Sequence, residues 1–531
     1  MGVIPLIDIT PEQYKTISSL LQRHLPGVKA WAYGSRAKWT SGPRSDLDMV
    51  VFSKPEQLRQ VADLREAFKE SDLPFRVDLF VWDDVPANFR SVIEEDHVVL
   101  TKVDCTHKPA KHIKHILADC IEMNEAAHSP KEKWSFINYL DTGNITENLI
   151  ADIQHLIIGQ DKIPSRARKK AQSGDIVYSL VRPIQKHYGL LKKIPKHFLV
   201  STGFSVFRGK PNFADTGFIY YYLTQNHVVD HLQTIAEHNT SAYPSIRPSD
   251  IQKLQINLPP LPTQQAIAHI LGTLDDKIEL NRRMNETLEA MALAIFKDWF
   301  VDFGPLRAKM EGREPYLSPE LWELFPNRLD EAGKPVGWEI CMVRDCFTLT
   351  MGQSPPSKTY NENGDGLPFF QGSTDFGFRY PKNRKYCTAP SRIAEKNYTL
   401  VSVRAPVGEI NKAWEKCCIG RGVATICHKS GNSSYTYYST WGIQQKLRGY
   451  EDTGTVFGSI NKKQFETLSI LQPSANSIIA FESLICPIDD YIRKNFIENL
   501  TLTQTRDLIL PKLLSGEIRI SDFEKILGAV V

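Results

Sequence analysis

A long helical segment that occurs twice limits what this chain can fold into. From Thr263 to Phe300, apolar residues recur alternately every four and three residues, and two asparagines, Asn281 and Asn285, interrupt that series. This is the a/d pattern of a coiled coil, although ordinary core packing is an alternative. At about 1.5 Å per residue the helix would be a rod roughly 50 Å long, longer than an average globular helix. We therefore expect a spacer.

The same segment returns near the C-terminus. Asn495 and Asn499 repeat the first pair of asparagines at an offset of 214 residues, and the same offset aligns Ser245 with Ser459 far upstream. The repeated unit is therefore a domain that ends in a helix. Because a buried asparagine fixes the register of paired helices, we predict that the two helices pair antiparallel. The residues expected at that pairing are Ile278, Asn281, Asn285, Ile492, Asn495 and Asn499.

Length and composition set the domain count and exclude some classes of protein. The 531 residues predict three or four domains, and 42% hydrophobic with 24% charged residues is typical of a folded protein. A net charge of +3 permits nucleic-acid binding without requiring it. We find no signal peptide and no apolar run near the roughly 20 residues of a membrane span. Nine cysteines without a CxxC pair indicate neither a disulfide framework nor a zinc site, so we expect a cytoplasmic protein.

The fold class that these patterns predict is a multidomain α+β protein, with an N-terminal α/β domain followed by two repeated α+β domains and their two long helices. The connector before the first repeat is expected to be a linker with a short helix from His112 to Asn124 and a solvated, non-metal histidine face. The expected segments are 1–104 (N-terminal domain), 105–132 (linker), 133–260 (first repeated domain), 261–303 (first long helix), 304–336 (linker), 337–472 (second repeated domain), 473–516 (second long helix) and 517–531 (tail).

Three aspartates in the N-terminal domain are candidate metal ligands. Asp46 and Asp48 alternate with apolar residues and so share one face of a strand, and Asp78 lies in another β-patterned run. Three carboxylates from adjacent strands suit Mg²⁺ bridging nucleotide phosphates. The turn at Gly34 and Ser35 would let backbone N–H groups approach those phosphates. We therefore expect a metal and nucleotide site here.

Basic and polar residues at strand ends in the repeated domains are candidates for DNA contacts. Arginine reads guanine through two hydrogen bonds, and arginine or lysine neutralises phosphates, although a basic loop is often only solvated. The run SLVRP at 179–183 is echoed by SVRAP at 402–406, and we take Arg182 and Arg404 as equivalent. The candidates are Arg166, Arg168, Ser179, Arg182, Gln371, Arg379, Ser402 and Arg404.

Several motifs carry a resemblance to one family. They are FKDWFVDFGP (296–305), GQSPPSKTYNENGDGLPFFQGSTDFG (352–377), VSVRAPVGEIN (401–411), IGRGVAT (419–425) and the two long helices. With them, the chain from about residue 133 resembles the specificity (S) subunit of type I restriction-modification systems. The resemblance implies two target recognition domains, each reading half of a split double-stranded DNA sequence, held apart by the paired helices. It also implies two methyltransferase (M) subunits, which would carry S-adenosylmethionine, and restriction/translocase (R) subunits joined through the complex.

The N-terminal domain is not part of that family's usual pattern. Its Gly-Ser turn, DxD strand and third aspartate resemble the minimal nucleotidyltransferases of the polymerase-β superfamily, which implies possible use of Mg²⁺ and a nucleoside triphosphate. Two functions therefore stay open. The first is a non-catalytic DNA-recognition subunit that needs no cofactor, which the repeat favours. The second is a nucleotidyltransferase acting on a protein or RNA, with a DNA-directing tail. The chain lacks a [DN]PP[YF] methyltransferase loop, a Walker-type loop and a nuclease motif, so we expect partners to perform the chemistry.

Overall fold

The computed structural model divides the chain into two compact units. One comprises Met1–Gly272 with Asp507–Val531, and the other comprises Thr273–Arg506. The structure describes residues 7–518 and Ile520, except for 38–40, 43–44, 87–88, 91–92, 94–96, 101–112, 130, 240–242 and 452–457. Within these residues, no helix has both the length and the apolar composition to cross a bilayer.

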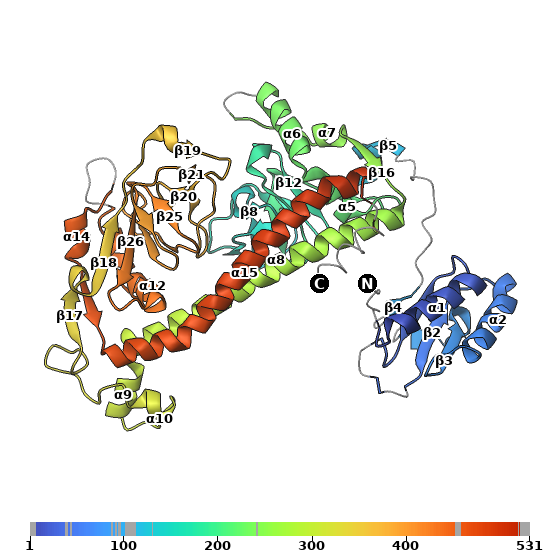
Figure 1. The fold of residues 1–531 in the computed structure, drawn as a ribbon. Helices are drawn as coiled ribbons and strands as arrows, with labels where there is room; N and C mark the ends of the chain where they lie inside the picture. Colours follow the sequence, from blue (N-terminus) through green and yellow to red (C-terminus); the bar gives the residue numbers. More distant parts are fainter. Residues whose placement is uncertain are drawn as a thin grey trace. The chain divides into compact units, whose positions relative to one another are not determined.

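The N-terminal domain is a four-stranded sheet with two helices packed on one face (Figure 1). A capping box between Thr10 and Gln13 begins the first helix, and alternating strand residues face the two sides of the sheet. The edge strand β3 runs parallel to β2, whereas the central pair, β2 and β1, is antiparallel. The sheet order is β3-β2-β1-β4, and the elements are α1 (Pro11–His24), β1 (Ala30–Tyr33), β2 (Leu47–Val51), α2 (Leu58–Lys69), β3 (Val77–Val81) and β4 (His97–Val99).

The first repeated domain contains two four-stranded sheets. Their orders are β13-β12-β15-β6 and β10-β7-β14-β11, and β7 runs parallel to β14. Its elements are β5 (Ile113–Ile116), α4 (Leu117–Cys120), β6 (Ile121–Met123), β7 (Phe136–Leu140), β10 (Gln154–Ile157), β11 (Ala167–Lys170), β12 (Ile176–Ser179), β13 (Tyr188–Leu190), β14 (Phe198–Ser201), β15 (Phe204–Gly209), α5 (Thr216–Leu223), α6 (Asn226–Asn239), α7 (Pro248–Gln252) and β16 (Gln255–Leu258), with a small hairpin of β8 (Ile145–Thr146) and β9 (Leu149–Ile150).

The expected linker at 105–132 is therefore wrong over much of its length. Strand β5 pairs with β16 and strand β6 pairs with β15, so residues 113–123 belong to the first repeated domain. The helix expected from His112 to Asn124 is replaced over its described residues by a strand, one helical turn and a second strand. Leu117 and Cys120 are fully buried in the core. Their elements are too short to show a clear hydrophobic period, which is why the sequence suggested a polar connector.

The second repeated domain has the same plan. The sheet β18-β26-β23-β24 matches β6-β15-β12-β13 strand for strand, and in the second sheet, β19-β21-β20-β25-β22, β20 runs parallel to β25 as β7 does to β14. The two halves therefore repeat as folds. The elements are β17 (Glu339–Met342), α11 (Val343–Cys346), β18 (Phe347–Met351), β19 (Tyr360–Asn361), β20 (Leu367–Phe370), β21 (Tyr386–Cys387), β22 (Ile393–Ala394), β23 (Thr399–Ser402), β24 (Ile410–Lys412), β25 (Cys417–Ile419), β26 (Val423–His428), α12 (Ser433–Gly442), α13 (Gln444–Arg448), α14 (Lys462–Glu466) and β27 (Ser469–Gln472), which pairs with β17.

Each repeated domain leads into one long helix, α8 (Leu261–Phe300) or α15 (Ala475–Ser515) (Figure 1). Between them, α9 (Gly304–Met310) and α10 (Pro319–Trp322) lie in the expected second linker. In the second unit, the apolar seam of α8 near Phe296 and Trp299 packs with Ile478 and Phe481 of α15. The helices run antiparallel there, because the C-terminal part of α8 meets the N-terminal part of α15.

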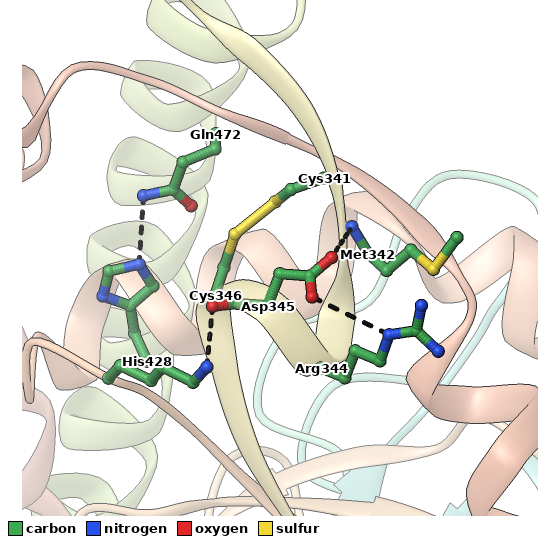
Figure 2. The surroundings of a disulfide bond; sticks show 8 residues. Cys341, Met342, Arg344, Asp345, Cys346, His428 and Gln472 are labelled. Carbon is green, nitrogen blue, oxygen red and sulfur yellow. Dashed lines mark hydrogen bonds and ion pairs between the residues drawn. A yellow bond between two sulfur atoms is a disulfide. The ribbon is translucent and has the colours of Figure 1, made fainter.

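The structure contains one disulfide bond within the described residues, whereas the sequence indicated no disulfide framework. Figure 2 shows the bond between Cys341 on β17 and Cys346 at the end of α11. Between the two cysteines the chain turns from strand to helix, and Asp345 accepts a hydrogen bond from the backbone N–H of Met342 at 3.1 Å. This local turn brings together two cysteines whose spacing matches no CxxC pattern.

Candidate functional site

Three loops of the second repeated domain surround a cavity of about 500 Å³. They follow β20, follow β23, and join β25 to β26. The predicted residues Gln371 and Arg404 both line the cavity, so the structure brings these two together. Arg421 joins them, and the sequence analysis missed it. Its position between two glycines in IGRG, at a strand-to-strand turn, is the signal that could have found it.

Glycines allow the three loops to approach one another. A Cβ atom at Gly422 would overlap the backbone oxygen of Gln371, and one at Gly352 would overlap the backbone oxygen of Gly420. The backbone N–H of Arg421 donates to the hydroxyl of Ser354 at 3.3 Å, which ties the GQS segment to the same turn. The GQS and IGRG motifs thus build the wall of the cavity through close backbone contact.

The cavity is electropositive. Its lining residues include two arginines and no aspartate or glutamate. Two other exposed arginines of this domain have acidic partners: Arg384 pairs with Asp375 at 2.8 Å and Arg448 with Glu409 at 3.1 Å. Within the described residues, no carboxylate forms an ion pair with Arg404 or Arg421, and both residues are exposed. Two unneutralised guanidinium groups on one cavity attract an anionic ligand.

The first repeated domain presents the same loops with different side chains. Leu140 pairs with Val200 as Phe370 pairs with Ile419, which places Asp141 where the second domain has Gln371 and Thr202 where it has Arg421. The carboxylate of Asp141 accepts a hydrogen bond from the Tyr139 hydroxyl at 2.9 Å. The backbone arrangement of these loops is therefore shared by the two domains, whereas their side chains differ.

The predicted equivalence of Arg182 and Arg404 is wrong by one residue. Val181 bridges Ser245 as Arg404 bridges Ser459. Arg182 thus takes the position of Ala405, and the backbone N–H groups of both donate to the equivalent loop. The Arg182 guanidinium lies 5.5 Å from the ring centroid of Tyr243. The side chains of Arg182, Arg166 and Arg168 are exposed, so all three stay candidates for DNA contact.

Both serines in the predicted set are buried and bond to their own loops. Ser179, 2% exposed, donates to the backbone oxygen of Val181 at 3.0 Å. Ser402, 0% exposed, donates to the backbone oxygen of Pro406 at 2.6 Å and accepts from the N–H of Glu409. They shape the loops and do not face a ligand. Serine at a strand end commonly bonds to neighbouring backbone groups, which explains the error.

Arg379 is also not a surface residue. It is 1% exposed, and its guanidinium donates to Asp489 of α15 at 2.5 Å and to the hydroxyl of Tyr438 at 3.0 Å, and forms an ion pair with Glu289 of α8 at 3.2 Å. Lys412 joins the same group through Asp489 at 2.8 Å. We call Arg379, Lys412, Glu289 and Asp489 the buried ion cluster. It anchors the second repeated domain to both long helices and is closed to DNA.

The predicted asparagines hydrogen-bond across the two helices. Asn281 donates to the side-chain oxygen of Asn499 at 2.9 Å, and Asn495 donates to that of Asn285 at 2.9 Å. Asn285 and Asn499 also donate to backbone oxygens of the opposite helix, at Ile492 and Ile278 respectively. Both asparagine pairs form together only in this register. A shift of one turn would leave buried polar groups unsatisfied, so the pairs fix the alignment.

The N-terminal domain brings two of its three predicted aspartates into register. Asp48 lies opposite Asp78 on parallel strands and opposite Tyr33 on the other side. Burial, then Asp78 and Asp46, raise the pKa of Asp48, and burial with both strand aspartates raises the pKa of Tyr33 to about 12. Gly34, at φ +79°, lies so close that a Cβ there would overlap the Asp48 carboxylate.

The donor set of this acidic site fits a hard cation, because it consists of carboxylate oxygens. Across the part of the chain that the structure describes, no three Asp, Glu, His or Cys residues are arranged to hold a metal ion. Arg76 forms an ion pair with the Asp78 carboxylate at 2.7 Å, and the Arg76 side chain is 76% exposed. The metal assignment stays a prediction.

Comparison with known proteins gives the family. Residues 120–290 match the type I restriction modification DNA specificity domain, and residues 15–105 match the polymerase beta nucleotidyltransferase domain. The chain is 28% identical over 440 residues to the type I restriction enzyme HindI specificity subunit of Haemophilus influenzae, covering 72% of this chain and 94% of that protein. It is 30% identical over 355 residues to a putative type I restriction enzyme specificity subunit, MjaX, of Methanocaldococcus jannaschii, covering 65% and 79%.

The N-terminal match is separate. Over 101 residues, 19% of this chain, it is 38% identical to the probable protein adenylyltransferase MntA of Haemophilus influenzae and covers 89% of that protein. The chain thus combines two matches on one polypeptide. It belongs to the family of type I restriction enzyme specificity subunits and carries a polymerase-β-type nucleotidyltransferase domain at its N-terminus.

Proposed function

We propose that this chain reads a bipartite target on double-stranded DNA, one half-site with each repeated domain. The observation that carries the proposal is that equivalent loops of the two domains carry different side chains. The first domain has Asp141 and Thr202 where the second has Gln371 and Arg421. Two domains with the same backbone fold and different hydrogen-bonding side chains suit two different half-sites, because each base pair presents its own pattern of donors and acceptors in the groove.

The long helices are proposed to set the distance between the half-sites. Their asparagine pairs permit a single register, so the length of the paired segment is a fixed quantity. Between the half-sites we expect a spacer of fixed length, roughly one half-turn to one turn of DNA. Methylome sequencing of a host that carries the complete system tests both points. A bipartite methylated motif is expected, whereas a continuous motif would contradict the proposal.

The outer surface of the helices supports an assembly role. On this pair, Leu280, Met291 and Tyr491 are 55%, 50% and 59% exposed. Large exposed apolar side chains on a helix pair are compatible with a protein-binding surface. We propose that two methyltransferase (M) subunits bind this chain and supply S-adenosylmethionine, and that restriction/translocase (R) subunits join through them. The expected result is co-purification with the M subunit, lost when Leu280 and Tyr491 are both changed to Glu.

The N-terminal domain supports a second candidate function, nucleotidyl transfer to a protein or RNA. The close approach of Gly34 to Asp48, beside Asp78, is the specific observation. Asp46, Asp48 and Asp78 would hold Mg²⁺, which when bound neutralises phosphate charge, and the backbone at Gly34 and Ser35 would orient the triphosphate. Labelled ATP incubated with the full chain and host lysate tests this. Labelled product is expected, and Asp48→Asn should abolish it.

A further inference from the structure

The cavity of the second repeated domain has the chemistry of a phosphate site. It is concave, and its lining residues include two arginines, Arg404 and Arg421, together with Ser373 and Thr374. An arginine that reads a base must project into a groove, whereas a hollow receives the part of DNA that protrudes, which is the sugar-phosphate strand. A guanidinium group can hold two phosphate oxygens through parallel hydrogen bonds, and a second arginine adds further positive charge. The shape and the charge therefore indicate the same ligand.

Gln371 also lines the cavity, and it differs from the two arginines in carrying no charge. It is neutral, exposed and directly follows β20. Its backbone oxygen accepts the N–H of Gly422, so the residue is held beside the turn that bears Arg421. An amide adds little to phosphate attraction, but it can pair with the N6 and N7 edge of adenine. A residue next to a phosphate clamp is within reach of a base edge.

We propose that Arg404 and Arg421 clamp one backbone phosphate of the second half-site, and that Gln371 beside them reads a base of that half-site. The inference rests on the proposed function and divides its contacts into positioning and reading. It assigns Arg404, which the sequence predicts as a DNA contact of either kind, to a phosphate. It also adds Arg421, whose counterpart in the first domain is Thr202, so the clamp belongs to the second half-site alone.

The test measures binding of the full chain to two duplexes, one carrying the motif from the methylome and one with its second half-site scrambled. Arg404→Ala and Arg421→Ala should each weaken both duplexes alike and reduce the slope of log affinity against log salt by about 1. Gln371→Ala should keep that slope and weaken only the cognate duplex, by roughly 5- to 150-fold. Arg344→Ala, an exposed arginine on α11 outside the cavity, is the matched control and should change neither quantity.

The outcomes separate the two levels of the proposal. If the unmodified chain binds both duplexes equally, the proposed function fails. If it discriminates between them but the two arginine variants keep the full salt slope, or lose only the cognate duplex, the clamp is overturned. Melting temperatures of all four variants, equal to that of the unmodified chain, exclude misfolding as the cause of any loss.

Discussion

Replacing Arg379 by Met should destabilise the second unit strongly. The guanidinium faces Asp489 and Glu289 while 1% exposed, and removing one member of a buried ion pair costs about 3–5 kcal/mol. The remaining contacts are unequal. Asp489 keeps Lys412 and the Ser434 hydroxyl, both at 2.8 Å, whereas Glu289 keeps only the Tyr437 hydroxyl at 3.0 Å. We therefore expect the lower end of the range, about 3 kcal/mol, mostly from Glu289.

The assay is thermal unfolding followed by calorimetry, in which the second unit is assigned by the transition that moves. For a unit of roughly 150–250 residues, about 3 kcal/mol lowers its melting temperature by about 6–12 °C. Arg384→Met is the matched control, because Arg384 pairs with Asp375 with its side chain 56% exposed and such pairs contribute about 0–1 kcal/mol. Equal shifts for the two variants would refute the assignment of the cluster as an anchor.

The pH dependence gives a second check on the same variant. Burial raises the pKa of Glu289 above its ordinary value, and the neighbouring Arg379 opposes that rise. Removing Arg379 raises this pKa further, so the folded state then binds a proton that the unfolded chain releases more easily. The folded variant is therefore favoured as the pH falls, and its deficit against the unmodified chain should shrink between neutral and mildly acidic pH. A deficit that grows on acidification would contradict the role given to Glu289.

Three other changes test the remaining parts. Deleting seven residues from each long helix shortens the paired segment by about 10 Å and should shorten the spacer in the methylated motif by about three base pairs. An unchanged spacer would show that the helices do not set its length. Asp141→Asn should relax the first half-site alone by roughly 5- to 150-fold in binding, because a carboxylate beside DNA is favourable only when it accepts a base amino group. Mg²⁺ with ATP should raise the melting temperature of the N-terminal domain, and Asp48→Asn should abolish that rise by removing a ligand. Because the pKa of Asp48 is raised in the folded state, the free domain should also gain stability as the pH falls toward that pKa, a gain absent in the variant.

The features that the sequence could predict are those with a period or a repeat. The a/d seam placed α8 and α15 within a few residues of their ends, and the repeated asparagines indicated which four amides lie where the helices pair. The strand from Ala30 to Tyr33 and the strand position of Asp48 likewise reflect local geometry, whereas Asp46 lies just before its strand. These signals depend on neighbours along the chain, so they survive without knowledge of tertiary contacts.

What the sequence could not predict depends on partners far along the chain. Arg379 lies in a loop rich in glycine and aromatic residues and looks exposed, but its partners are 90 and 110 positions away. The one-residue shift between Arg182 and Arg404 follows from matching the two arginines by residue type, whereas the ungapped register from Ser179 and Ser402, which the bridges to Ser245 and Ser459 confirm, places Arg182 opposite Ala405. Strand β6 is too short to carry a pattern and is defined by pairing with β15.

The two repeats use one acidic helix position in different ways. Asp275 and Asp489 match at the offset of the repeat. Asp275 bonds to Arg506 of the opposite helix at 2.8 Å, whereas Asp489 bonds to Arg379 and Lys412 of the second repeated domain. The helix supplies the acid in both cases, and a different part of the chain supplies the cation. The cations that anchor the second domain lie apart from the loop tips at Gln371, Arg404 and Arg421 that line the cavity. Those tips can therefore change with little cost to the anchor, because distant sites contribute to stability almost independently.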